Sequence, residues 1–103
     1  MHRVINAKRD EIAALCRRYH VRRLEVFGSA ARGDDFLPAS SDADFLVEFD
    51  ASAVLPPLEQ FFGLQAALSR LLGRPVDLIE AKAIRNPYLL ANINRARNVI
   101  YAT

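Results

Sequence analysis

Three short runs of strand-forming residues, alternating with stretches of helical periodicity, constrain the fold of this chain most strongly. The runs cover residues 24–27, 42–49 and 75–80 and are rich in β-branched, aromatic and leucine side chains. Strands that alternate with helices of ten or more residues favour helices packed on a small, largely buried sheet. We therefore expect an α+β (α/β-like) fold, in which a small mixed β-sheet is flanked by helices.

Three segments carry the apolar spacing of amphipathic helices: residues 4–19, 56–73 and 87–97. The second begins at Pro56-Pro57 and ends at Gly73, in keeping with proline at helix starts and left-handed glycine at helix ends. An apolar end, Val99-Ile100-Tyr101, follows the third. Between the first two strands we expect a short helix at residues 29–33, capped by Ser29, and a loop at residues 34–41.

The chain has 103 residues, and we expect one domain, 1–103, with a single hydrophobic core. Its net charge is only +2 and its basic residues are scattered, which argues against a dedicated nucleic-acid binder. The single Cys16 cannot form an internal disulfide. No stretch approaches the roughly 20 apolar residues that span a bilayer, and the first residues lack the apolar centre of a signal peptide. We expect a cytoplasmic protein.

Two aspartates, Asp42 and Asp44, stand at the start of the second strand. Residues two apart on a strand project from the same face, so both carboxylates can reach one cation or a close pair of cations. A bound divalent ion would remove their mutual repulsion. The alternative is that the two acids only end a loop, because acids are common at turns.

A third aspartate, Asp77, lies in the apolar third strand, where a carboxylate is costly unless it is paired or binds a metal. If the second and third strands are neighbours, the three carboxylates converge at one edge of the sheet. Oxygen ligands of this kind favour magnesium or manganese over zinc. An ion pair between Asp77 and Arg74 or another basic residue is the competing explanation.

The turn Gly28-Ser29 supplies features that suit phosphate binding. Glycine leaves room for close approach, and backbone N–H groups and the Ser29 hydroxyl at a helix start can hold phosphate oxygens. Arg32, one turn further on, can add a charged contact to the same phosphates. A simple helix cap explains the Gly-Ser pair equally well.

Other conspicuous residues are expected to be structural. Periodicity assigns four aromatic residues to the core rather than to base stacking: Phe45, Phe49, Phe61 and Phe62. Cys16 is expected to be a small core residue, and His20 to satisfy carbonyls at a helix end.

The order and spacing of these motifs resemble the signature of the polymerase-beta-like nucleotidyltransferases. The matching strings are residues 28–33, 41–49 and 76–79. More narrowly, the chain resembles the minimal nucleotidyltransferase (MNT) branch, and residues 85–88 and 99–101 resemble the tail of that branch. The chain departs from the commonest pattern at Ala43, where many relatives carry a larger aliphatic residue. That side chain is expected to face away from the acids, so we expect a packing change only.

The resemblance implies a role for each matching residue. Asp42, Asp44 and Asp77 would be the catalytic residues and would ligate two Mg²⁺ ions, with Mn²⁺ as an alternative. The nucleoside triphosphate would be bound by Gly28, Ser29, Arg32 and Ser41. One ion would activate the attacking hydroxyl and the other would neutralise the triphosphate and the leaving pyrophosphate.

The implied activity is transfer of a nucleoside monophosphate, AMP from ATP, to a hydroxyl of an acceptor. The resemblance suggests that the acceptor is a tyrosine of a HEPN-type toxin, so that the chain is the antitoxin of a HEPN/MNT pair and works in a homo- or hetero-oligomer. Two alternatives stay open. The chain could neutralise its partner by binding alone, or it could act on a small molecule as a homodimer.

Overall fold

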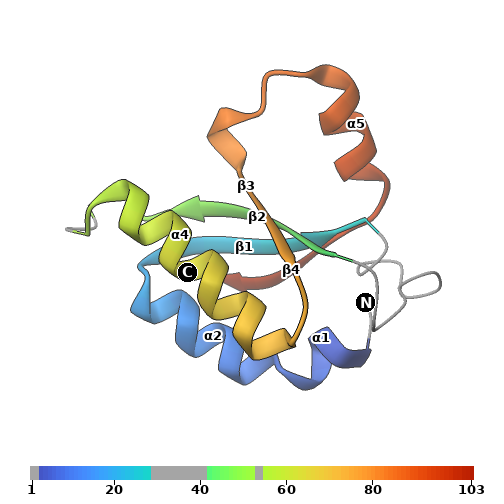
Figure 1. The fold of residues 1–103 in the computed structure, drawn as a ribbon. Helices are drawn as coiled ribbons and strands as arrows, with labels where there is room; N and C mark the ends of the chain where they lie inside the picture. Colours follow the sequence, from blue (N-terminus) through green and yellow to red (C-terminus); the bar gives the residue numbers. More distant parts are fainter. Residues whose placement is uncertain (1–2, 29–41, 53–54) are drawn as a thin grey trace.

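The computed structural model of the chain describes residues 3–28, 42–52 and 55–103 (Figure 1). In chain order its elements are α1 (Arg3–Ala7), α2 (Arg9–Arg18), β1 (Val21–Phe27), β2 (Ala43–Phe49), α4 (Pro57–Leu72), β3 (Val76–Glu80), the 3₁₀ turn η1 (Ala81–Ala83), α5 (Pro87–Arg95) and β4 (Arg97–Ala102). The expected short helix at residues 29–33 and the loop at 34–41 lie outside the described residues.

The four strands form one sheet in the order β3-β2-β1-β4. β1 pairs antiparallel with both β2 and β4, whereas β2 and β3 run parallel. The sheet is therefore mixed, which confirms the expected fold class. The parallel pair places the starts of β2 and β3, where the aspartates lie, at the same edge of the sheet.

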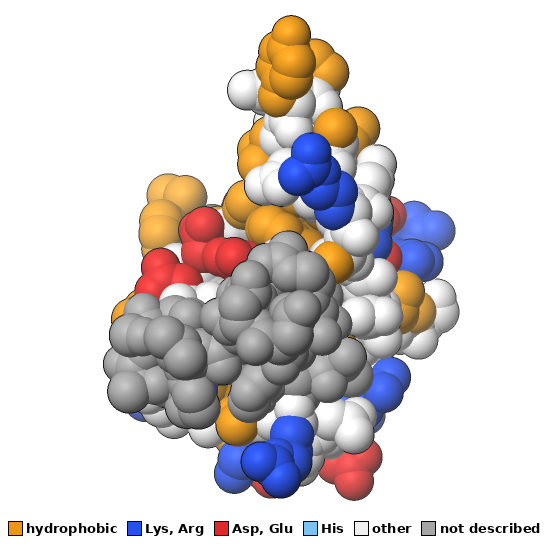
Figure 2. Space-filling model, turned by 90° about the vertical axis from the view of Figure 1, so that its right-hand side faces the viewer, with side chains coloured by type: hydrophobic (Ala, Val, Ile, Leu, Met, Phe, Trp, Pro, Cys, Tyr) orange, Lys and Arg blue, Asp and Glu red, His pale blue; other side chains and the backbone are white. Residues whose placement is uncertain are grey.

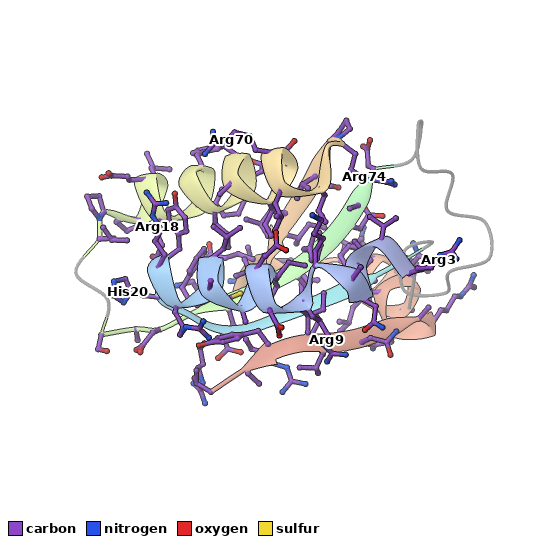
Figure 3. The ribbon with its side chains drawn as sticks, turned by 90° about the horizontal axis from the view of Figure 1, so that it is seen from below. Arg3, Arg9, Arg18, His20, Arg70 and Arg74 are labelled. Carbon is purple, nitrogen blue, oxygen red and sulfur yellow. The ribbon has the colours of Figure 1, made fainter. Side chains whose placement is uncertain are left out.

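Helices α2 and α4 lie side by side over one face of the sheet (Figure 3). Their inward side chains and those of the strands form the main core, whose fully buried members include Ile12, Cys16, Leu24, Val26, Phe45, Val47, Leu64 and Leu68.

On the other face of the sheet, α5 packs through Ile93 against Phe27 and Leu46. The helix projects from the rest of the domain and carries hydrophobic side chains outward (Figure 2), and both Tyr88 and Leu90 are exposed. This second face is thus covered only in part, and it carries the alternate side chains of β1 and β2.

The segment predicted as one helix over residues 4–19 is divided at Lys8. This residue has φ −101° and ψ 12°, and its N–H donates to the carbonyl of Ile5, three residues back, at 3.1 Å. The tighter turn separates α1 from α2, so this part of the prediction was wrong. After α2, His20 takes a left-handed conformation with φ 57°, and its N–H donates to the Arg17 carbonyl at 3.3 Å. A role for its imidazole stays a prediction.

The end of the chain also differs from the prediction. The last helix stops at Arg95 instead of residue 97, and the apolar end belongs to a fourth strand, β4, that was not predicted. β4 pairs with β1, 70 or more residues earlier in the chain. A local pattern of residues contains no sign of so distant a partner.

The middle helix was predicted well. α4 begins at Pro57, ends at Leu72 and is followed by Gly73 in the left-handed conformation at φ 67°. Phe45 is fully buried, and Phe49 and Phe61 are half-buried against the main core. Phe62, however, is 58% exposed, so its assignment to the core was wrong. It stands on the outer side of the helix, where periodicity alone did not separate it from its neighbour.

In the parts of the chain that the structure describes, none of the helices has the length and apolar character needed to cross a membrane.

Replacing Gly63 by alanine is expected to destabilise the fold, although alanine is the better helix former by about 1 kcal/mol. An added Cβ would lie 2.6 Å from Cε1 of Tyr19, where α4 crosses the end of α2. Overpacking of this kind costs about 1–3 kcal/mol, so the net loss should be roughly 1 kcal/mol in urea unfolding. In a Tyr19→Ala background the same substitution is expected to stabilise. A destabilisation of equal size in both backgrounds would contradict this packing account.

Candidate functional site

Asp44 and Asp77 are direct neighbours across the parallel pair of strands. In the register of β2 and β3, Ala43 lies opposite Val76 and Asp44 lies opposite Asp77. Because side chains at paired positions project from the same face, the two carboxylates lie beside each other. Ala43 is fully buried in the main core on the opposite face, which confirms that it faces away from the acids.

Negative charge accumulates at Asp44. Partial burial, and then the charges of Asp77 and Asp42, raise the pKa of the Asp44 carboxyl from 3.8 to about 6. The charges of Asp42 and Asp77 therefore both act on the Asp44 carboxylate, at the edge of the sheet where β2 and β3 begin. Asp77 itself is exposed, so the sequence argument that burial would make it costly was wrong. Its position in the register, and not its burial, is what brings it to Asp44.

The predicted phosphate-binding turn begins next to the carboxylate of Asp44. Gly28 directly follows β1, has φ +69°, and donates its N–H to the carbonyl of Ala96 at 3.1 Å. A Cβ at this position would lie 3.0 Å from Oδ2 of Asp44. Glycine is thus required twice, for the left-handed backbone and for the close approach. Ser29, Arg32 and Ser41, the other predicted nucleotide-binding residues, lie outside the described residues.

The three acids fit a divalent cation in their chemistry. Across residues 3–28, 42–52 and 55–103, no three acidic, histidine or cysteine side chains already stand in a geometry that could hold a metal ion. Asp42 and Asp77 are exposed, however, and exposed side chains change rotamer within nanoseconds. Their donors are carboxylate oxygens, the ligands that Mg²⁺ and Mn²⁺ prefer. A cation would also remove the repulsion that raises the pKa of Asp44.

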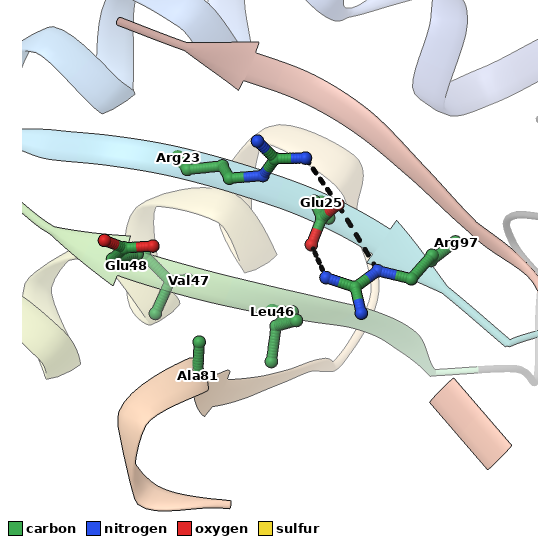
Figure 4. Close-up of a pocket in the computed structure, with 7 residues that line it drawn as sticks. All are labelled: Arg23, Glu25, Leu46, Val47, Glu48, Ala81 and Arg97. Atoms are coloured by element: carbon green, nitrogen blue, oxygen red, sulfur yellow. Dashed lines mark hydrogen bonds and ion pairs between the residues drawn. The ribbon is translucent and has the colours of Figure 1, made fainter. Parts of the chain in front are cut away.

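A second charged cluster on this face was missed by the sequence analysis. Glu25 of β1 is only 4% exposed, and its carboxylate accepts hydrogen bonds from Arg97 of β4 and from Arg23 (Figure 4). Arg97 also donates to Oδ1 of Asn94 at 2.6 Å. Burial opposes the charge of Glu25, but the hydrogen bonds and charges of the two arginines outweigh it and lower its pKa. The available signal was a glutamate between Leu24 and Val26, in the middle of an apolar strand.

Aspartates gathered beside a glycine turn at one edge of a sheet suit the binding of a divalent cation and phosphate groups. A sequence model of the family described as "Nucleotidyltransferase domain" matches residues 10–100. The chain therefore belongs to the nucleotidyltransferase domain family.

Individual relatives agree with this assignment. A candidate protein adenylyltransferase of Methanocaldococcus jannaschii is 40% identical over 76 residues, which cover 74% of this chain and 73% of the relative. A solved structure described as a candidate minimal nucleotidyltransferase superposes with a TM-score of 0.73 at 32% identity, over 95% of each chain. The fold is also that of a complex from Shewanella oneidensis described as a tri-AMPylated HEPN toxin with its MNT antitoxin, with a TM-score of 0.64, 18% identity, and coverage of 95% of this chain and 72% of that one.

Proposed function

We propose that this chain transfers AMP from ATP to a hydroxyl group of a HEPN-type toxin and thereby acts as its antitoxin. The single observation that carries the proposal is the meeting of Asp44 with Asp77 and Asp42 beside the open backbone of Gly28. The acceptor is inferred from the relatives. The M. jannaschii protein is named for adenylyl transfer to protein, and the S. oneidensis toxin carries AMP groups in a complex with an antitoxin of this fold.

Asp42, Asp44 and Asp77 are the residues that would hold one or two Mg²⁺ ions, or Mn²⁺ in their place. When bound, such ions supply positive charge to the triphosphate and to the departing pyrophosphate. Gly28 lets the phosphates approach the chain closely, because it has no side chain beside Asp44. Asp77 is exposed on the edge strand β3, and in the proposal it lies nearest to the acceptor hydroxyl.

The chemical step is an in-line displacement at the α-phosphorus of ATP. The acceptor oxygen forms a bond to the α-phosphorus. At the same time the bond between the α-phosphorus and the oxygen that bridges it to the β-phosphate breaks. Pyrophosphate leaves with this oxygen, and the hydroxyl proton is released. In-line transfer requires the entering and leaving oxygens on opposite sides of the phosphorus. Asp77 on β3, Asp44 on β2 and Gly28, directly after β1, follow one another across the sheet, and the proposal arranges the acceptor, the α-phosphorus and the pyrophosphate in the same order.

The test is to incubate the purified chain and its toxin with Mg²⁺ and ATP labelled at the α-phosphate. Label is expected on the toxin, and it should be lost with Asp42→Ala or Asp44→Ala. The matched control is Glu80→Gln, since Glu80 follows Asp77 on β3 but pairs with Lys82 at 3.6 Å. Label that persists in both aspartate variants would refute the proposal. If those variants still neutralise the toxin, binding alone is the function.

A further inference from the structure

The partly covered face of the sheet holds a cavity that the proposed chemistry leaves without a role. It has a volume of about 220 Å³ and is lined by Arg23, Glu25, Leu46, Glu48, Ala81 and Arg97, together with Val47 (Figure 4). Leu46 lies two residues after Asp44 on β2, and Glu25 is its partner on β1. Residues two apart point to the same face, so the cavity lies on the face that carries Asp44.

We infer that this cavity holds the adenine base of the donor nucleotide, an inference that rests on the proposed function. The line from Asp77 through Asp44 to Gly28 runs across the strands and would contain the acceptor oxygen, the α-phosphorus and the leaving pyrophosphate. Apart from the acceptor oxygen and the pyrophosphate, the nucleoside is the only substituent of this phosphorus that is larger than a single oxygen atom. It must leave the line sideways, along the strands.

In one of the two directions along the strands the sheet ends, and in the other the face continues over Leu46. A strand rises 3.2–3.4 Å per residue, so Leu46 lies about 7 Å beyond Asp44. A ribose bridges a similar distance between its 5′-phosphate and its base. The cavity volume corresponds to roughly seven waters at about 30 Å³ each, which is room for a bicyclic base but too little for a whole nucleotide.

The lining suits a base with both a π-face and polar edges. The carboxylate of Glu25 fixes two guanidinium groups, those of Arg23 and Arg97, and arginine planes are surfaces on which bases stack. Leu46 and Ala81 supply apolar contacts.

Selectivity is expected to come from Glu48, whose side chain is 43% exposed and pairs with Arg22 at 3.3 Å. Its carboxylate retains lone pairs for the 6-amino group of adenine and would repel the 6-oxygen of guanine. The cavity therefore fits ATP better than GTP.

A pair of substitutions in η1 distinguishes the binding of the base from the binding of the phosphates. Ala81 is half-buried and lines the cavity, so Ala81→Phe fills it, whereas Ala83→Phe places the same side chain at an exposed position of the same turn. Calorimetric titration with Mg²⁺·ATP and with Mg²⁺·tripolyphosphate, which has no nucleoside, measures the two contributions. Ala81→Phe is expected to weaken ATP binding by about tenfold to hundredfold and to leave tripolyphosphate binding unchanged. Ala83→Phe should change neither.

Glu48→Gln keeps the shape of the cavity and tests the inference even if Ala81→Phe does not fold. It is expected to reduce the preference for ATP over GTP by about tenfold, with tripolyphosphate binding unchanged. The inference is overturned if folded Ala81→Phe binds ATP like the wild type, if Glu48→Gln keeps the full ATP preference, or if the wild type binds ATP no tighter than tripolyphosphate. In those cases the proposed function stands. A wild type that binds neither compound would overturn both.

Discussion

Replacing Asp44 by asparagine is expected to abolish AMP transfer and at the same time to stabilise the metal-free protein at neutral pH. The amide side chain would keep the size of the carboxylate but would lose the charge that a cation needs. Metal ions contribute several kcal/mol to stabilising a transition state, and each 1.36 kcal/mol is a factor of ten in rate. We therefore expect the rate of toxin labelling to fall by at least about 10³-fold. The Glu80→Gln variant, which removes a charge from the neighbouring strand, should label at the wild-type rate.

The gain in stability follows from the pKa of Asp44. Because partial burial and the charges of Asp77 and Asp42 raise this pKa from 3.8 to about 6, the folded state binds a proton more tightly than the unfolded state. Without metal, the wild type should be most stable below the unfolded pKa and should lose stability as pH rises through about 6. The loss is at most roughly 3 kcal/mol, and Asp44→Asn should not show it.

Thermal unfolding in EDTA between pH 4.5 and 7.5 measures this difference. The wild-type Tm is expected to fall relative to that of Asp44→Asn across this range, and added Mg²⁺ should restore the wild type only. Parallel pH profiles for the two proteins would show that the pKa of Asp44 is not raised in the folded state, and would contradict this account.

Replacing Gly28 by alanine is expected to reduce labelling by about 10²-fold or more. The new Cβ would lie 3.0 Å from Oδ2 of Asp44 and would displace this carboxylate, and displacements of about 1 Å at a reacting centre cost on that order. The left-handed backbone, with φ +69°, adds a loss of about 1–2 kcal/mol in stability for a residue that has a Cβ.

Gly73→Ala is the matched control for Gly28→Ala. Gly73 has nearly the same φ of +67°, but an added Cβ there meets nothing within 4 Å. Urea unfolding should show a similar loss of stability for both variants, while only Gly28→Ala loses transfer when both are assayed as folded protein. Equal transfer by the two variants would mean that the contact with Asp44 is irrelevant to catalysis.

Features set by local sequence could be predicted from the chain alone. Pro57 and Gly73 define the ends of α4, and the apolar run after Asp44 defines β2. Asp42 and Asp44 were also recognisable, because residues two apart on a strand share one face. Their convergence with Asp77 depended on β2 and β3 being neighbours, which the sequence allowed but did not require.

Features set by distant pairing could not be predicted. β4 is a strand because β1 supplies its hydrogen bonds, and the cluster on Glu25 forms only because that pairing brings Arg97 next to it, 72 residues later in the chain. The division of the first helix at Lys8 reflects backbone geometry that apolar spacing does not record.

The central claim is that Asp42, Asp44 and Asp77 form one cation site beside Gly28, and paramagnetic broadening by Mn²⁺ tests it most directly. With substoichiometric Mn²⁺ added to the ¹⁵N-labelled protein, the amide signals of these four residues are expected to broaden first, while those of α2 stay sharp. Asp44→Asn should remove the effect, and excess Mg²⁺ should reverse it. Broadening centred on another part of the chain, or unchanged in Asp44→Asn, would contradict the account.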